Sequence, residues 1–266
     1  NSLLLTVLSS SVLTIRPFRI LICGNIFAVN FPTIRYKGKN INRKNILEII
    51  SGIENCDKTD VTFLKDMDEE FAFPEMGTLG WTPYSNDMTM ALNIDPAWIT
   101  LDDYIGCLSK KYKKRTEKII SAGKKMIRKE MNAEEIRDEF GQIENLFIQV
   151  ASKQTVRMGL IGGDYFYEFK KRFKDSFSFF GYYYENKLVA FTTYIEHGNV
   201  LEIHYIGIDY VFNKDLLIYF NILLDGVEQA ILRKKEQLEL GRTAREAKAN
   251  LGGIPVYFND YININC

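Results

Sequence analysis

Two ionisable side chains, Glu202 and His204, stand two residues apart in an apolar run that is typical of a β-strand. Residues i and i+2 of a strand project from the same face of a sheet, so the carboxylate and the imidazole would lie side by side. Either group can remove a proton from a reacting molecule, directly or through water. The alternative is structural: a carboxylate at the solvent end of the strand and a histidine satisfied within the core.

The polar residues that follow this strand form a second candidate group. Asp209 comes directly after the strand. It can orient a substrate amine or an arginine, and its structural alternative is a turn residue. Tyr210 and Tyr219 are candidate proton donors. In a chain with 15 tyrosines both are also explained as packing residues.

Gly241 and Arg242 occupy the junction between a short apolar run and a short helix. Thr243 opens a T-x-x-E capping box, which predicts that the helix begins there. Backbone N–H groups at a helix start suit an anionic or carbonyl ligand, and the Arg242 guanidinium can fork onto a carboxylate or phosphate. The alternatives are an ion pair for Arg242 and a capped helix that only closes the sheet. Lys248 is expected to face out of this helix into solvent.

The segment Lys110–Lys129 contains ten basic residues and a single acidic one, Glu117. On a helix these charges form a stripe opposite Leu108, Tyr112 and Ile119. Such a stripe can follow an RNA backbone and is a candidate contact for tRNA. Its ordinary interpretation is a solvated helix face.

The composition limits the class of protein. The chain has 266 residues, 46% hydrophobic and 26% charged, which is typical of a soluble chain with one large or two smaller domains. Its 34 basic and 34 acidic residues cancel, so net charge does not favour general binding to nucleic acid or membranes. Four scattered cysteines indicate reduced thiols in a cytoplasmic protein. Two histidines argue against a zinc site. No apolar run reaches the roughly 18 residues of a membrane span.

From residue 124 onward the pattern predicts a regular succession of elements. The expected strands are Lys124–Met131, Phe177–Tyr184, Leu188–Glu196, Val200–Ile208, the run before Gly241, and Val256–Ile262. Helices are expected after Asn132, where Glu135 completes a capping box, then around Tyr165–Phe173, from Asp215 to Lys235, and after Gly241. This order predicts an α+β fold with one mixed sheet.

The first half shows a weaker pattern. Its expected strands are Leu3–Val12, Arg19–Cys23, Phe27–Phe31, Val61–Met67 and Met88–Ile94. One helix is expected over Ile41–Ile53, with Ile46, Ile49 and Ile53 on one face, and another begins at Thr100. Because the order matches the later part of the second half, the first half is interpreted as a partial, divergent copy. The predicted division is 1–100, a basic connecting helix over 101–123, and 124–266.

The second half resembles the GNAT acyltransferase superfamily in its order of elements, and its motifs resemble one branch. His204-Tyr205-Ile206-Gly207-Ile208-Asp209, then Asn213, then Leu217-Ile218-Tyr219 are similar to that branch's H-Y-I-G-x-D, N and L-x-Y signature. The run from Leu240 to Pro255 is similar to its G-R-T-A-x-E-x-K-x-x-L-G-x-x-P segment. This branch groups with the Fem-type peptidoglycan transferases, which are built from two GNAT-like domains.

The resemblance implies a GNAT-like fold and transfer of an acyl or aminoacyl group to an amine, either of a small molecule or of a cell-wall precursor. The catalytic candidates are then Glu202, His204 and Tyr219. The substrate-binding candidates are Asp209, Tyr210, Asn213, Gly241, Arg242 and Thr243. No cysteine or serine stands in a nucleophile motif, which favours direct attack. A second class stays open, a non-catalytic GNAT-like module that recognises a cell-wall or small amine ligand.

One departure from the GNAT pattern bears on the donor. GNAT proteins that bind acetyl-CoA usually carry R/Q-x-x-G-x-G/A before the long helix, where backbone N–H groups hold the pyrophosphate. This chain has Asp209–Asp215 there, without glycine and with two acidic residues. We therefore expect weak or no acetyl-CoA binding, and the donor stays open between an acyl-CoA and an aminoacyl-tRNA.

Overall fold

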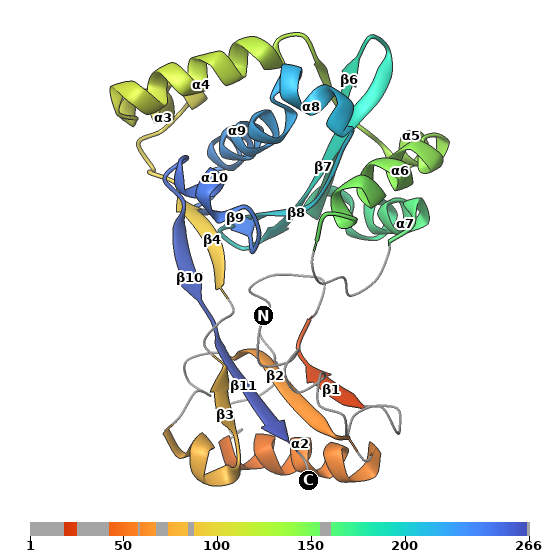
Figure 1. Ribbon diagram of the computed structural model, residues 1–266, viewed down its shortest axis with the longest axis vertical. Helices are drawn as coiled ribbons and strands as arrows, with labels where there is room; N and C mark the ends of the chain where they lie inside the picture. The colour runs from red at the N-terminus through yellow and green to blue at the C-terminus, as the bar shows by residue number, and fades with distance from the viewer. Residues whose placement is uncertain are drawn as a thin grey trace. The chain divides into compact units, whose positions relative to one another are not determined.

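The computed structural model describes residues 19–25, 43–57, 59–67, 74–84, 88–154 and 161–264. It divides the chain into two compact units, one made of Asn1–Met88 and Val256–Cys266 and the other of Thr89–Pro255. Figure 1 shows the elements of each unit. The strands expected at Leu3–Val12 and Phe27–Phe31 lie outside the described residues.

The first unit holds a four-stranded sheet in the order β1-β2-β11-β3. Its strands are β1 (Ile20–Cys23), β2 (Val61–Met67), β3 (Thr82–Tyr84) and β11 (Asn259–Ile264). β1 and β2 are parallel, whereas β11 runs antiparallel to both of its neighbours. The residues that the structure describes in this unit also form the helix α2 (Arg43–Asp57) and the 3₁₀ helix η3 (Pro74–Leu79).

The apolar face of α2 differs from the one expected. Ile46 and Ile50 are buried and pack in one cluster with Leu64 of β2, whereas Ile49 is 59% exposed. The prediction that Ile49 shares the buried face was therefore wrong. Ile46 and Ile50 are spaced i,i+4, the separation at which two side chains stack on one side of a helix.

The second unit is built on a seven-stranded mixed sheet in the order β10-β4-β9-β8-β7-β6-β5. Its strands are β4 (Met88–Asn93), β5 (Ile127–Glu130), β6 (Phe177–Tyr184), β7 (Lys187–His197), β8 (Val200–Ile208), β9 (Gln237–Gly241) and β10 (Ile254–Tyr257). Neighbours from β5 to β8 are antiparallel, and β8 and β9 are parallel. The turn between β6 and β7 holds Glu185 and Asn186 at positive φ, as a tight hairpin requires.

Helices lie on both faces of this sheet (Figure 1). They are α3 (Leu101–Cys107), α4 (Lys110–Gly123), α5 (Ala133–Asp138), α6 (Phe140–Ala151), α7 (Gly163–Phe173), the 3₁₀ turn η4 (Lys174–Ser176), α8 (Tyr210–Leu216), α9 (Ile218–Leu232) and α10 (Arg245–Ala249). On one face α6 packs on β7 and β8, and α7 packs on β6. On the other, α9 packs on β8 and β9, and α4 packs on α9.

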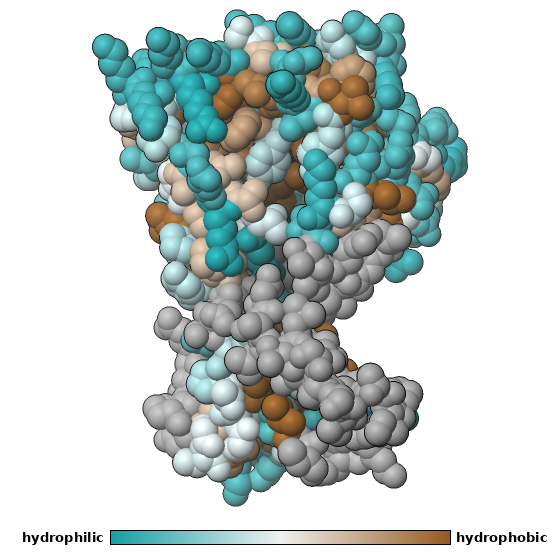
Figure 2. All heavy atoms as spheres, viewed as in Figure 1, coloured by the Kyte–Doolittle hydropathy of each residue, from teal (hydrophilic) through white to brown (hydrophobic). Residues whose placement is uncertain are grey.

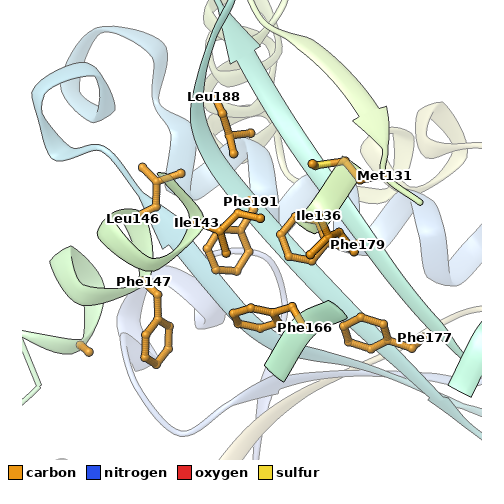
Figure 3. Close-up of a cluster of buried hydrophobic side chains, with 11 residues drawn as sticks. Met131, Ile136, Ile143, Leu146, Phe147, Phe166, Phe177, Phe179, Leu188 and Phe191 are labelled. Atoms are coloured by element: carbon orange, nitrogen blue, oxygen red, sulfur yellow. The ribbon is translucent and has the colours of Figure 1, made fainter. Parts of the chain in front are cut away.

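Aromatic rings fill the space between the sheet and helices α5–α7 (Figure 3). Phe166 of α7 is fully buried and contacts the rings of Phe179 and Phe191 edge to face. The rest of this core is Met131, Ile136, Ile143, Leu146, Phe147, Ala151, Phe177 and Leu188. Gly207 belongs to this packing, because a Cβ atom there would lie 2.2 Å from the Phe191 ring. This core fixes the position of β8.

Most of the expected elements of the second unit are confirmed. The three strands β6, β7 and β8 match to within one residue, and α5 begins at Asn132 with the predicted capping box to Glu135. The helix expected over Asp215–Lys235 is instead two helices, because Leu217 takes the left-handed conformation between α8 and α9.

The basic segment also differs from the single helix expected over 101–123. It is two helices, α3 and α4, with Leu108 and Ser109 extended between them. β4, expected in the first domain, pairs with β9 in the second unit's sheet, and β11 pairs within the first unit. The interpretation of the first part as a partial copy of the second remains a prediction. Among the described residues, no helix is long and apolar enough to cross a membrane.

Candidate active site

The parallel strands β8 and β9 separate from each other within the sheet. Their register joins Val200 to Gln237, Leu201 to Leu238 and Glu202 to Glu239, and it ends there although β8 continues to Ile208. We call the region where pairing stops the fork. Parallel strands that separate inside a sheet leave room for a ligand between their edges.

The last rung of the paired region carries two carboxylates. Glu202 and Glu239 are register partners, so their side chains project from the same face of the sheet, with backbones about 5 Å apart. Each residue is 1% exposed. Glu202 contacts the Nε2 atom of His197 at 3.3 Å. Glu239 accepts hydrogen bonds from the Thr89 hydroxyl and from the backbone N–H of Gly241.

Burial favours the protonated form of Glu239. Loss of hydration raises the pKa of its carboxyl, although the bonds from Thr89 and Gly241 and the charges of Lys248 and Arg242 act in the opposite direction. Its Oε2 atom is buried and has no hydrogen-bond partner among the described residues. A carboxyl in this state is suited to exchange a proton with a bound group.

Lys248 lies buried at the end of β9, beside the fork, rather than in solvent. It is 3% exposed, and its Nζ donates a hydrogen bond of 3.0 Å to the Gly241 carbonyl. Burial lowers the pKa of this amine to about 8, opposed by the nearby Glu239. The expectation that Lys248 is solvated was wrong, because α10 turns this side of the helix toward the end of β9.

One further expectation for this segment is revised. α10 begins at Arg245 with Ala244 as its N-cap, in the left-handed conformation and without a side-chain cap, so Thr243 does not open a capping box. Gly241 has φ of 83°, which favours glycine at the end of β9. Thr243 is exposed and Arg242 is partly buried in the turn that follows.

His204 lies on the α7 side of a bulge in β8. The register between β7 and β8 shifts between Thr192 and Tyr194, and the Thr193 hydroxyl accepts the N–H of Tyr205 and donates to its carbonyl. The imidazole packs against the Phe169 ring and lies 3.4 Å from the Tyr165 hydroxyl. Burial lowers its pKa to about 3. An imidazole that holds a proton so weakly is a poor general base at neutral pH.

The group predicted beyond β8 is placed elsewhere. Asp209 caps α8 by accepting the Val211 N–H, and it forms an ion pair of 3.0 Å with Lys187. Asp209 lies seven positions beyond Glu202 along an extended strand, so at about 3.3 Å per residue the two are roughly 20 Å apart. Asp209 is therefore a helix cap at the far end of β8.

The other members of that group also have local partners. Asn213 accepts the N–H of Tyr219 at 3.0 Å, and so caps the start of α9. Tyr210 donates its backbone N–H to the Gln149 side chain. Burial raises the pKa of Tyr219 to about 12. The structure thus divides the predicted residues into two groups, with Glu202, Gly241 and Arg242 at the fork and Asp209, Tyr210, Asn213 and Tyr219 around α8.

The sequence analysis did not assign three residues to this site. It did not single out Thr89 and Glu239, and it placed Lys248 in solvent. A signal for Glu239 exists. Leu201-Glu202-Ile203 and Leu238-Glu239-Leu240 are matching apolar–Glu–apolar triplets in two strands that a GNAT-like order makes neighbours. Thr89 has no such signal, because it comes from a strand far away in sequence.

The order of elements in the second unit and the separation of one parallel pair define a GNAT-like α+β fold that is similar to the fold of FemX. FemX is similar to this chain with a TM-score of 0.60 and 9% identity, over 86% of this chain and 79% of that one. The C-terminal domain of a putative lysylphosphatidylglycerol synthetase from Agrobacterium fabrum gives 0.57 and 11%, over 84% and 72%. L-PGS from Bacillus licheniformis gives 0.53 and 11%, over 82% and 71%.

At such identities the likeness to these structures shows the fold alone. No protein-family model and no curated protein matches the sequence.

Proposed function

We propose that this protein transfers an acyl or aminoacyl group to an amine by direct attack at the fork. The observation that carries the proposal is the register pair Glu202 and Glu239, two buried carboxylates on the last rung before β8 and β9 separate. The fold supports it, because solved structures of this fold include FemX and a domain of a protein named as a putative lysylphosphatidylglycerol synthetase.

The proposed reaction needs three proton and charge functions. Glu202 removes a proton from the attacking amine. The proton then passes to solvent through His197, which contacts Glu202 and has a side chain that is 30% exposed. Backbone N–H groups on the facing edges of the fork stabilise the oxyanion that forms on the donor carbonyl. Glu239 in its protonated form returns a proton to the leaving thiolate or alkoxide. His204 is not assigned as a base, because its pKa is about 3.

The donor is proposed to be an aminoacyl-tRNA rather than an acyl-CoA. The starts of both α8 and α9 are already capped, by the Asp209 carboxylate and the Asn213 amide oxygen. These side chains take N–H groups that would otherwise bind a pyrophosphate. Seven lysines on and just after α4 are exposed and form no ion pair with the residues that the structure describes; they are Lys110, Lys111, Lys113, Lys114, Lys118, Lys124 and Lys125. Figure 2 shows the hydrophilic surface over this helix.

The acceptor is proposed to be the amine of a small molecule or of a cell-wall precursor. We propose that one amine binds between Glu202 and Glu239, because these two carboxylates are register partners and lie side by side. The rival function is a non-catalytic module that binds such an amine. It is favoured by the weak basicity of His204, and it predicts ligand binding without turnover.

The test compares Glu202→Gln with a matched carboxylate, Glu196→Gln. Glu196 lies on β7 of the same sheet but pairs with Arg233 and Lys235. Turnover is measured with acetyl-CoA and with charged tRNA as donors, against a panel of amines. We expect Glu202→Gln to lower turnover by about 10²–10⁴-fold and Glu196→Gln to leave it nearly unchanged. Full activity in Glu202→Gln would remove Glu202 from the mechanism. Binding of an amine without turnover for any donor would favour the rival.

Donor choice has its own control. Reversing the charge at Lys113 and Lys114 should weaken binding of tRNA and flatten its dependence on salt, whereas the same reversal at Lys171 and Arg172 of α7 should not. Micromolar affinity for acetyl-CoA, together with salt-independent tRNA binding, would contradict the assignment of the donor.

A further inference from the structure

We propose that Lys248 is a positioning residue of the fork, whose amine holds the Gly241 carbonyl and thereby fixes the turn that keeps β9 apart from β8. Any effect on the reaction rests on the proposed function, whereas the effect on the turn does not. At the end of β9, beyond Glu239, the backbone is no longer paired with β8.

Both polar groups of the Gly241 backbone are held by side chains. Its N–H donates to Glu239 at 2.9 Å, and its carbonyl accepts from Lys248 at 3.0 Å. Gly241 has φ of 83°, so the chain turns at this residue. Gly241 remains the register partner of Met90 on β4, and these side chains hold its backbone groups where pairing with β8 has ended.

The turn needs such support, because Ala244 is held at φ of 51°. A residue with a Cβ atom rarely adopts this left-handed conformation, and it does so only where its surroundings impose it. The backbone N–H of Lys248 donates to the Ala244 carbonyl at 3.3 Å. Lys248 is thus bonded to both ends of the turn, through its side chain at Gly241 and its backbone at Ala244.

Lys248 is itself held in place. Its carbonyl accepts the N–H groups of Leu251 and Gly253, each at 3.0 Å. A Cβ atom on Gly253 would lie 2.9 Å from that carbonyl, so only glycine permits this close approach. Tyr104 of α3 donates its hydroxyl to the Leu251 carbonyl. The amine therefore reaches Gly241 from a fixed base.

Charge makes this support sensitive to pH. The amine faces Glu239 of β9, and Arg242 of the turn and Glu202 of β8 lie around the same carboxyl; α10 itself contributes the exposed Arg245 and Glu246. A charged amine makes a stronger bond to a carbonyl than a neutral one does. Since burial lowers the pKa of Lys248 to about 8, the bond should weaken as pH rises through this value.

The test is amide hydrogen exchange of the segment 237–249 in the full chain, from pH 6.5 to 9.5, corrected for the intrinsic effect of pH. In the unaltered protein, protection of this segment should fall as pH passes about 8. Lys248→Met should lose about tenfold or more of that protection at every pH, and Lys248→Arg, which keeps its charge, should retain it at high pH. Circular dichroism shows whether each variant is folded.

Lys235→Met is the matched control, because Lys235 also donates its Nζ to a glycine carbonyl, that of Gly198, but outside the fork. It should leave the exchange of 237–249 unchanged. Equal protection in Lys248→Met and the unaltered protein, or protection that does not change with pH in the latter, overturns the inference. Since exchange needs no substrate, absence of transferase activity would count against the proposed function and not against the role of Lys248.

Discussion

Two regions of the second unit's sheet bury different kinds of side chain. Between β6–β8 and helices α5–α7 the core is mainly aromatic, with Phe166, Phe179 and Phe191 at its centre. At the fork between β8 and β9 the buried side chains are Glu202 and Glu239. Burial of rings stabilises the fold, whereas burial of carboxylates costs free energy. The difference supports the proposal that the second region is the functional one, held in place by the first.

The largest effect on stability is expected in the aromatic region. Phe166 is 0% exposed and touches the rings of Phe147, Phe179 and Phe191. Phe166→Ala should lower the free energy of unfolding by about 3–5 kcal/mol, because it leaves a cavity among rings that cannot collapse into it. Chemical denaturation measures this. A cost below about 1 kcal/mol would show that the region is not the rigid support of β8.

A smaller loss is expected at Gly207, where the same region is too tightly packed for one more methyl group. A Cβ atom there would lie 2.2 Å from the Phe191 ring and 2.8 Å from Leu146. Gly207→Ala should cost about 1–3 kcal/mol. Gly141→Ala is the control. Gly141 lies in helix α6, and a Cβ atom there would meet nothing within 4 Å. That variant should be neutral or slightly stabilising in the same denaturation experiment.

His204 stands between the two regions and should reveal itself through pH. Its pKa is about 3 in the folded protein against 6.5 for an ordinary histidine. The unfolded chain therefore binds a proton that the folded one does not, and stability falls as pH drops from 6.5 towards 3. At pH 5 this amounts to about 2 kcal/mol. His204→Phe should lack this dependence. Equal pH profiles of the two proteins would mean that the imidazole is hydrated.

The smallest effect on stability is expected at the fork. Its dependence on pH is opposite to that of His204. Burial raises the pKa of Glu239, so its contribution is most favourable below the ordinary pKa of a glutamate and is lost as pH rises through the folded value. Glu239→Gln should change stability by less than about 1 kcal/mol at pH 4 and become relatively more stable towards pH 8. A variant that is strongly destabilised at pH 8 would place Glu239 among the structural residues.

The aromatic region could be predicted from the sequence because its signals are local. Strong alternation and two short turns define β6, β7 and β8, and Asn132 with Glu135 marks the start of α5. The fork could be predicted only in part. Glu202 stands out beside His204, but the burial of Lys248 depends on how α10 is seated by Gly253 and Leu251. These contacts join residues whose types alone indicate an exposed helix.

Two failures of the sequence predictions share one cause. Thr243 and Glu246 have the types and spacing of a capping box, yet Ala244 takes the cap position because the turn after β9 holds it in a left-handed conformation. Likewise Leu217 interrupts what the periodicity predicts as one helix. In both places tertiary contacts outweigh local preference, and one of the two, the turn at Ala244, lies next to the candidate site.

The place of β11 has a consequence for how the chain is made. This strand, Asn259–Ile264, lies between β2 and β3 in the first unit's sheet. A ribosome delivers β1, β2 and β3 early, but the strand that belongs between them emerges only after the whole of Thr89–Pro255. The second unit can therefore fold during synthesis, whereas the first must wait with its central position empty. β11 thus completes a sheet whose other three strands precede the second unit in the chain.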